Sequence, residues 1–121
     1  MAAPNIVNVA TITAKTVGLA LTTTSQDVVT NTAASGKVFK VNSVYVANVD
    51  GSVSADATVA WYDASSATTF SLGKTVPVPN DATLVVVDKN ATIYLEEGDK
   101  ITGLASSNGK LEIVVSYEEI S

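Results

Sequence analysis

The sequence predicts an all-β fold, a two-sheet antiparallel β-sandwich of the jelly-roll or Greek-key type. No stretch has the apolar period of an amphipathic helix. Instead, runs rich in Val, Thr and Ile alternate with Gly, Asn, Asp and Ser clusters roughly every 8–12 residues, as in sandwiches and barrels. The chain has 121 residues, the size of one domain, so residues 1–121 are expected to form a single β-sandwich domain.

Five of the predicted strands have simple patterns. Two Thr-rich strands are expected at residues 6–13 and 17–24, and a short one at 27–31. Residues 57–61 form another strand, and 68–76 form a weaker one that a glycine interrupts. β-Branched side chains favour such strands because they pack well on a pleated surface.

The segment between residues 37 and 49 is too irregular for one flat strand. Its large apolar side chains change parity halfway along; the two sets are Phe39 and Val41, then Val44 and Val46. Because successive side chains of a strand point to opposite faces, both sets reach the core only if an extra residue separates them. We therefore expect a β-bulge near Asn42 and Ser43.

Residues 110–118 have the clearest strand pattern of the chain. Four alternate side chains form an apolar face, and only Val114 breaks the polar face; the apolar set is Leu111, Ile113, Val115 and Tyr117. One side of this strand should therefore face the core and the other side water. Asn108-Gly109 just upstream is a strong signal for a two-residue hairpin, so residues 100–105 are expected to be its antiparallel partner.

Two more strands are expected before this one. Residues 82–87 are apolar on both faces, as a central strand would be. They follow a segment in which Pro77 and Pro79 require a loop or an edge strand, because proline cannot donate to a sheet ladder. Residues 92–95 form a short strand that ends in a tight turn, where Gly98 is expected in the left-handed conformation.

The composition removes most catalytic chemistry. The chain has no Cys and no His, and all seven basic residues are Lys. Histidine is the commonest general base and transition-metal ligand, and cysteine is required for thiolate and disulfide chemistry. The sequence therefore predicts that the protein is not an enzyme and uses no cofactor and no metal.

The charge of the chain limits its partners. A formal net charge of −5 disfavours binding to nucleic acid and to anionic membranes, so neither is expected as a partner. No run approaches the ~20 apolar residues of a membrane-spanning helix. Residues 1–5 lack the basic and apolar regions of a signal peptide, which favours assembly in a cytoplasm or export without a classical signal.

Acidic side chains are the remaining candidates for a chemical site. Glu96 and Glu97 lie at a turn, and Glu118 and Glu119 point to opposite faces of a strand, so we interpret both pairs as solvated charges. The loop at residues 50–56 lacks the alternating ligands and the closing bidentate Glu of a calcium loop, and we interpret it as an inter-strand connection.

Two tyrosines are the candidate interface residues. The seven aromatic residues are spread among the predicted strands, and Trp61 alternates with small apolar residues, which favours a place in the core. Its neighbour Tyr62 then faces outward, and so does Tyr94. Exposed tyrosines on a sheet face are common interface anchors, although isolated surface aromatics are the alternative. Only 16% of the residues are charged, which is typical of a buried subunit interface and also of rigid extracellular β proteins.

Two resemblances to known families follow from particular segments. Residues 91–102, with the hairpin and final strand after them, resemble part of the trimeric jelly rolls of the tumour-necrosis-factor and C1q type. The chain as a whole resembles small structural proteins of tailed bacteriophages, particularly phages of cyanobacteria and marine bacteria. The segments that carry this second resemblance are 4–9, 35–41, 47–51, 94–99 and 116–120.

The phage resemblance implies a virion protein, most simply a capsid decoration (cement) protein. Such a protein would clamp subunits of the major capsid protein on the capsid surface after assembly in the host bacterial cytoplasm. The trimeric jelly rolls and the low surface charge together favour a homotrimer; the alternative is a monomer whose Thr- and Ser-rich faces are solvated. The alternatives are a neck, baseplate or tail-fibre-associated subunit, and a carbohydrate-binding β-sandwich, for which Tyr62 beside Asp63 is the only local candidate site.

Overall fold

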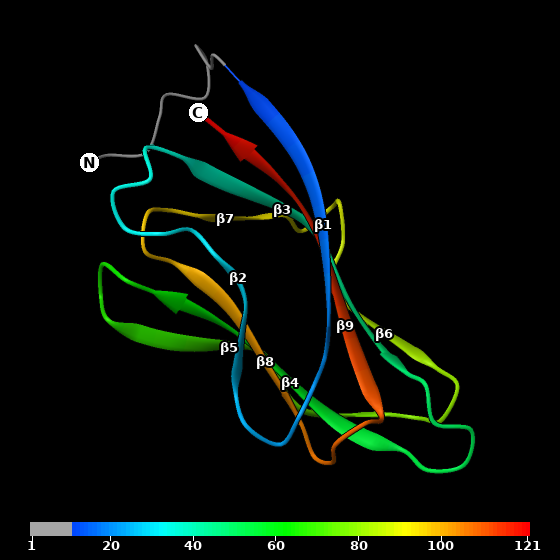
Figure 1. Cartoon of the computed structure of the whole chain (residues 1–121). Coiled ribbons are helices and arrows are strands. Elements are labelled where there is room, and N and C mark those ends of the chain that lie inside the picture. The colour runs from blue at the N-terminus through cyan, green and yellow to red at the C-terminus, as the bar shows by residue number, and fades with distance from the viewer. Residues whose placement is uncertain (1–10) are drawn as a thin grey trace.

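The computed structural model describes residues 11–121, which form nine strands in two antiparallel sheets and contain no helix. One sheet has five strands and the other four, and the two lie as separate layers in Figure 1. The five-stranded sheet contains β1 (Ile12–Ala20), β9 (Leu111–Ile120), β3 (Val38–Asn48), β6 (Thr83–Val87) and β7 (Ile93–Leu95). The four-stranded sheet contains β2 (Gln26–Thr30), β8 (Lys100–Ala105), β4 (Ala55–Asp63) and β5 (Thr68–Val78).

The strand pairs are nested within one another along the chain. β1 pairs with β9, β2 with β8, β3 with β6 and β7, and β4 with β5. Chain connections pass repeatedly from one sheet to the other, so the two sheets close over a shared core. This nesting is the jelly-roll arrangement, and it selects the jelly roll from the two topologies that the sequence left open.

The core between the sheets consists of the predicted inward faces. The alternation expected for β9 is confirmed, because its four apolar side chains are buried: Leu111, Ile113, Val115 and Tyr117. Val41, Val44 and Ile101 add fully buried side chains from both sheets. The aliphatic side chains of the two layers therefore interdigitate, as in other aligned sandwiches.

The bulge predicted in β3 is present. The register between β3 and β9 shifts between Val41 and Ser43, which leaves Asn42 as the extra residue. All four apolar side chains around it are buried, namely Phe39, Val41, Val44 and Val46. The bulge therefore lets side chains of opposite parity along one long strand point into the same core.

The prediction that residues 100–105 form a hairpin with the last strand is wrong. β8 pairs with β4 and β2, whereas β9 pairs with β1 and β3, so the connection passes between the sheets. A type I′ turn needs positive φ at both central residues, but only Gly109 has it (φ 77°). Asn108 instead accepts a hydrogen bond from Thr23 N at 3.0 Å, which ties the connection to the β1–β2 loop.

Two other sequence predictions need correction. β6 is an edge strand and not a central one; it is apolar on both faces because Val85 points outward and is 52% exposed. The predicted break between residues 13 and 17 is absent, since β1 continues through Lys15, which pairs with Tyr117. The part of the first predicted strand at residues 6–10 lies outside the described residues.

Predictions for the turns and the proline segment are confirmed. Pro77 lies in β5, which among the described strands pairs only with β4 and forms the edge of its sheet. Gly73 marks a shift in the β4–β5 register, in agreement with the predicted interruption. Gly98 has a φ of 90°, the expected left-handed conformation.

Candidate functional site

The two predicted interface tyrosines lie on opposite outer faces of the sandwich. Tyr94 in β7 is 44% exposed on the outer face of the five-stranded sheet, as predicted. Tyr62 in β4 also points outward, but it is half-buried, and the Lys100 ammonium lies over its ring at 5.3 Å. Lys100 in turn forms an ion pair with Asp27 at 3.1 Å. The structure therefore does not bring the two tyrosines into one patch.

The aromatic side chains are less dispersed than the sequence indicated. Phe39 and Tyr117 stack with ring centroids 5.1 Å apart, and Trp61 and Phe70 stack at 5.5 Å. The first pair joins β3 and β9, which are far apart in the chain, so the sequence could not show it; the second pair joins the consecutive strands β4 and β5. Trp61 packs against the core as predicted, although it is only partly buried.

Asp63, the polar member of the predicted sugar site, has partners in its own turn. Its carboxylate accepts hydrogen bonds from Ser65 Oγ at 2.8 Å, Ser65 N at 3.1 Å and Ser66 Oγ at 3.0 Å. The hydrogen bond from the Ser65 side chain is the main cause that lowers the pKa of Asp63. With Lys100 over the Tyr62 ring, both members of this candidate site already have intramolecular partners.

Glu119 is not the solvated charge that the sequence indicated. Its carboxylate lies 3.0 Å from the ammonium groups of both Lys15 and Lys37, and its side chain is only 11% exposed. Burial alone would raise the pKa of Glu119, but the hydrogen bonds and charges of the two lysines outweigh it and lower the pKa. The prediction failed because it could not include the neighbouring strands. β1 and β3 flank β9, and Lys15 in β1 and Lys37 just before β3 lie on its two sides.

Three other acidic candidates also have structural partners, whereas Glu96 is exposed at its turn, as predicted. Glu118 accepts a hydrogen bond from Asn42 at 3.3 Å, and Glu97 accepts one from Gly36 N at 3.0 Å. Asp50 pairs with Lys110 at 3.0 Å, and the hydrogen bond from this lysine is the main cause that lowers the pKa of Asp50. Within residues 11–121, no three acidic side chains gather closely enough to hold a metal ion, and no helix could cross a membrane.

Three buried polar residues were missed by the sequence analysis. Asn31, Asn48 and Asp99 are at most 3% exposed, and each binds the backbone of a connecting loop. Asn48 Nδ2 donates to Val53 O and Val78 O at 3.0 and 2.9 Å. These side chains therefore fix the loops of the sandwich, and in sequence they are indistinguishable from ordinary turn residues.

A row of uncharged side chains crosses the outer face of the five-stranded sheet. Val85, Tyr45, Val114 and Gly18 are direct cross-strand neighbours on β6, β3, β9 and β1. The three side chains are 52%, 41% and 36% exposed, respectively. We call these four residues the apolar row. The position of Tyr45 between the inward residues Val44 and Val46 indicates an outward side chain, but Tyr45 was not among the predicted interface residues.

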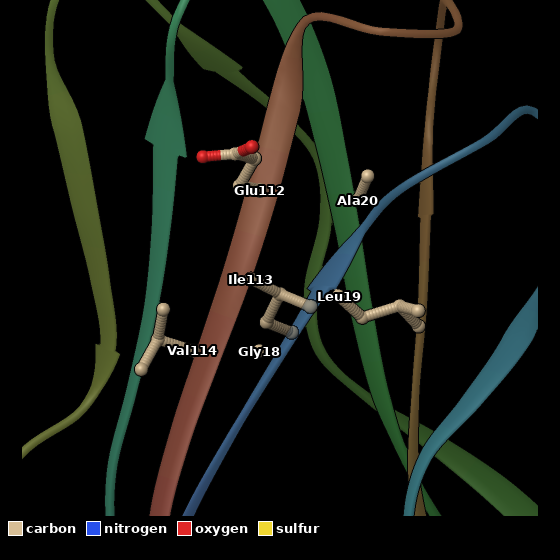
Figure 2. A pocket seen from close by; sticks show the side chains of 6 residues that line it. All are labelled: Gly18, Leu19, Ala20, Glu112, Ile113 and Val114. Carbon is tan, nitrogen blue, oxygen red and sulfur yellow. The ribbon is translucent and has the colours of Figure 1, made fainter.

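The apolar row ends in a shallow groove at β1. The groove has a volume of about 310 Å³ and is lined by Gly18, Leu19, Ala20, Glu112, Ile113 and Val114. Figure 2 shows Glu112 and Val114 pointing to one side of β9 and Leu19 pointing to the other side. A Cβ atom at Gly18 would lie 3.8 Å from Ile113 O, so the groove exists because this strand residue has no side chain.

Comparison with solved structures finds distant similarity in fold. No family model matches the chain, and no curated protein matches it. A solved chain described as part of Bacillus endospore appendages, a family of disulfide-linked pili, is similar with a TM-score of 0.48 and 17% sequence identity. The match covers 92% of this chain and 88% of that chain. A similarity this distant does not bear on function.

Proposed function

We propose that this chain is a virion structural protein, most specifically a capsid decoration protein that clamps neighbouring subunits of the major capsid protein. The observation that carries the proposal is the apolar row on the outer face of the five-stranded sheet. The phage resemblance of the sequence supplies the identity of the partner. The composition, without His and Cys, supports a role in binding and not in catalysis.

The apolar row has the features of an interface centre. Tyr45 lies in the middle of the row, and tyrosine is enriched among the residues that dominate binding energy. The nearest charges on the same face are rim residues: Glu112 in the next row, then Lys40 and Glu118 beyond the bulge. An uncharged centre with a charged rim is the usual anatomy of a protein interface.

The backbone beneath the row supports a rigid contact. The four residues lie on four adjacent strands that are hydrogen-bonded to one another. Side chains on a continuous sheet lose little conformational entropy on docking, compared with those on mobile loops. The face would therefore suit a broad, flat contact across the junction of two capsid subunits.

Such a contact stabilises a shell through linkage. A protein that binds the expanded lattice, but not the free capsid subunits, lowers the free energy of the lattice by an amount that increases with occupancy. No reaction is required, and no particular residue has to act on a bound molecule. The expected phenotype of a virus without the protein is a head that releases DNA on heating or at low salt.

Particle composition and location test the proposal. Purified virions should carry the protein on the head in hundreds of copies, seen by immunogold labelling and by quantitative mass spectrometry. Omission of the gene should lower the temperature of DNA release. Six to a few dozen copies at one end of the particle would instead assign the chain to a neck, baseplate or tail fibre. Normal head stability without the protein would exclude a decoration role.

The homotrimer remains a proposal about the same molecule. Tyr94 lies beside Lys40, beyond the β3 bulge from the apolar row, so a trimer contact through Tyr94 would leave the row free to dock. Tyr62, on the opposite outer face, would lie outside that contact. Tyr94→Lys should then reduce trimer formation without unfolding the domain. Light scattering reads the outcome: three times 12.4 kDa supports the trimer, and a mass of 12.4 kDa at high micromolar concentration contradicts it.

A further inference from the structure

The edges of the two sheets differ in how well they are blocked. β5 carries Pro77, a positive φ at Thr75 and two register shifts, while β2 has a register shift after Asp27. β6 and β7 have only five and three residues. All of these features discourage another strand from adding to the edge.

β1 has none of these blocking features. Its nine residues pair with β9 in unbroken register, and it contains no proline and no positive φ. β1 is the end strand of its sheet, and no other strand within residues 11–121 pairs with its second side. Figure 1 shows it running the length of the sandwich alongside β9. It presents an uninterrupted edge about 30 Å long.

The hydrogen bonds at both ends of β1 show which backbone groups are available. Thr11 and Ser121 exchange both N–H···O bonds, at 3.2 and 2.9 Å, and Leu21 N donates to Leu111 O at 2.9 Å. Because the register is unbroken, the odd-numbered residues of β1 bond to β9. The N–H and C=O groups of the even-numbered residues therefore point to the free edge: Ile12, Ala14, Thr16, Gly18 and Ala20.

The side chains along this edge would not hinder a second strand. Four of the five even-numbered residues are small, and none is charged. Lys15 is the only charged residue of β1, and its ammonium is held 3.0 Å from Glu119. A lysine directed at an open edge is a common defence against strand pairing, and here it is engaged within the chain.

We propose that β1 pairs antiparallel with β1 of a second copy across a two-fold axis through Thr16. A second copy is the partner that the structure favours, because an added strand needs a matching open edge and β1 is the unblocked edge among the described strands. Thr16 is the centre of β1, so the pairing overlaps all nine residues and forms roughly ten backbone hydrogen bonds. It also sets Lys15 opposite Val17 of the second copy and not opposite another lysine.

The resulting dimer would have one continuous outer face. A two-fold axis perpendicular to the sheet keeps both outer faces on the same side, so two apolar rows would be presented together. The inference rests on the β1 edge alone and does not require the proposed function. Its tests use the purified protein, whereas docking on a shell is read from particles, so the two can fail separately.

Cysteine cross-linking tests the register directly, because the natural chain has no cysteine. In the proposed dimer the two Thr16 Cα atoms lie about 5.5 Å apart, within the range that a disulfide spans. Thr16→Cys should therefore form disulfide dimers under mild oxidation. Thr30→Cys, at an exposed threonine of edge strand β2, is the matched control and should stay largely monomeric. Ala14→Cys should cross-link with Gly18→Cys when the two are mixed.

A charge variant supplies a second readout. Thr16→Lys places two ammonium groups opposite each other at the axis, and it should halve the mass of the assembly, whereas Thr30→Lys should not. The expected change is from twice 12.4 kDa to 12.4 kDa for a simple dimer, and from six to three times 12.4 kDa if the proposed trimer also forms. Equal cross-linking of Thr16→Cys and Thr30→Cys overturns the proposal, whatever mass light scattering gives for the natural protein. The proposal is also overturned by a monomer at high micromolar concentration. For such a monomer, hydrogen exchange of the β1 amides shows what lies at the β1 edge. Protected amides would indicate that residues 1–10 of the same chain pair with this edge, whereas rapidly exchanging amides would indicate that the edge is free for another partner.

Discussion

At the scale of single residues, Asp99 joins three parts of the chain. Its buried carboxylate accepts hydrogen bonds from Ala64 N at 2.9 Å, Glu96 N at 3.0 Å and Trp61 Nε1 at 3.4 Å. Asp99→Ala would leave these donors unpaired in the interior and should lower the free energy of unfolding by about 3 kcal/mol. Urea denaturation measures the change.

Asp63→Ala is the control for this prediction. Asp63 also accepts several hydrogen bonds, but only from Ser65 and Ser66 in an exposed turn. Its replacement should cost much less stability, because water can satisfy the donors that it leaves. Equal losses for the two variants would contradict the role assigned to Asp99.

Glu119 should make stability depend on pH in the acid range. Its folded-state pKa lies below the ordinary value of about 4.5, so its ion pairs stabilise the fold fully above that value. This stabilisation is lost as the pH falls through the lowered pKa. The free energy of unfolding of Glu119→Gln should therefore fall less steeply on acidification than that of the natural chain. Urea denaturation at each pH measures this free energy. Glu112→Gln, at an exposed position of the same strand, should leave the slope close to that of the natural chain; equal slopes for all three proteins would contradict the prediction.

The sequence predicted residue roles where strand parity alone decides them. The inward position of Val41 and the outward position of Tyr94 follow from the two-residue period of a strand. The roles of Asp99 and Glu119 depend on partners 35 or more residues away in the chain, such as Ala64 and Lys37. Strand parity carries no information about such pairs, so the sequence analysis misjudged Glu119 and missed Asp99.

At the scale of the elements, two glycines should respond to substitution in opposite ways. Gly18 lies in β1 with ordinary backbone angles, and a Cβ there would meet no atom closer than 3.8 Å. Gly98 has a φ of 90°, and its Cβ would lie 2.8 Å from Ala64 Cβ. Gly18→Ala should raise the free energy of unfolding by about 0.5 kcal/mol, and Gly98→Ala should lower it by about 2 kcal/mol. Urea denaturation separates the two signs; a destabilised Gly18→Ala would show that the groove at β1 is needed for the fold.

Element prediction succeeded where one strand contains the whole signal. The bulge at Asn42 was predictable because the parity change of β3 is local. The connection at Asn108-Gly109 was not predictable, because β8 and β9 belong to different sheets and pair with different strands. The dipeptide favours a tight turn, but nested pairing across the whole chain decides which strands become neighbours. It places β8 beside β2 and β4 in one sheet, and β9 beside β1 and β3 in the other.

At the scale of the whole molecule, the jelly roll leaves two outer faces of different character. The five-stranded sheet presents the apolar row, whereas Tyr62 on the opposite face is covered by Lys100. The sandwich class could be predicted from the spacing of turns and strands. The difference between the faces could not, since it arises from the register of four strands drawn from distant parts of the chain.

The proposed function requires that the outer face of the five-stranded sheet dock on a capsid shell. The most direct test is rebinding of purified protein to heads made without it, read by co-sedimentation. The natural chain should bind in hundreds of copies per head and saturate. Tyr45→Lys, which places a charge at the centre of the apolar row, should weaken binding at least tenfold while the domain stays folded. Thr69→Lys, on the outer face of the other sheet, should bind as the natural chain does. Equal binding by Tyr45→Lys, or no binding by the natural chain, would contradict the claim.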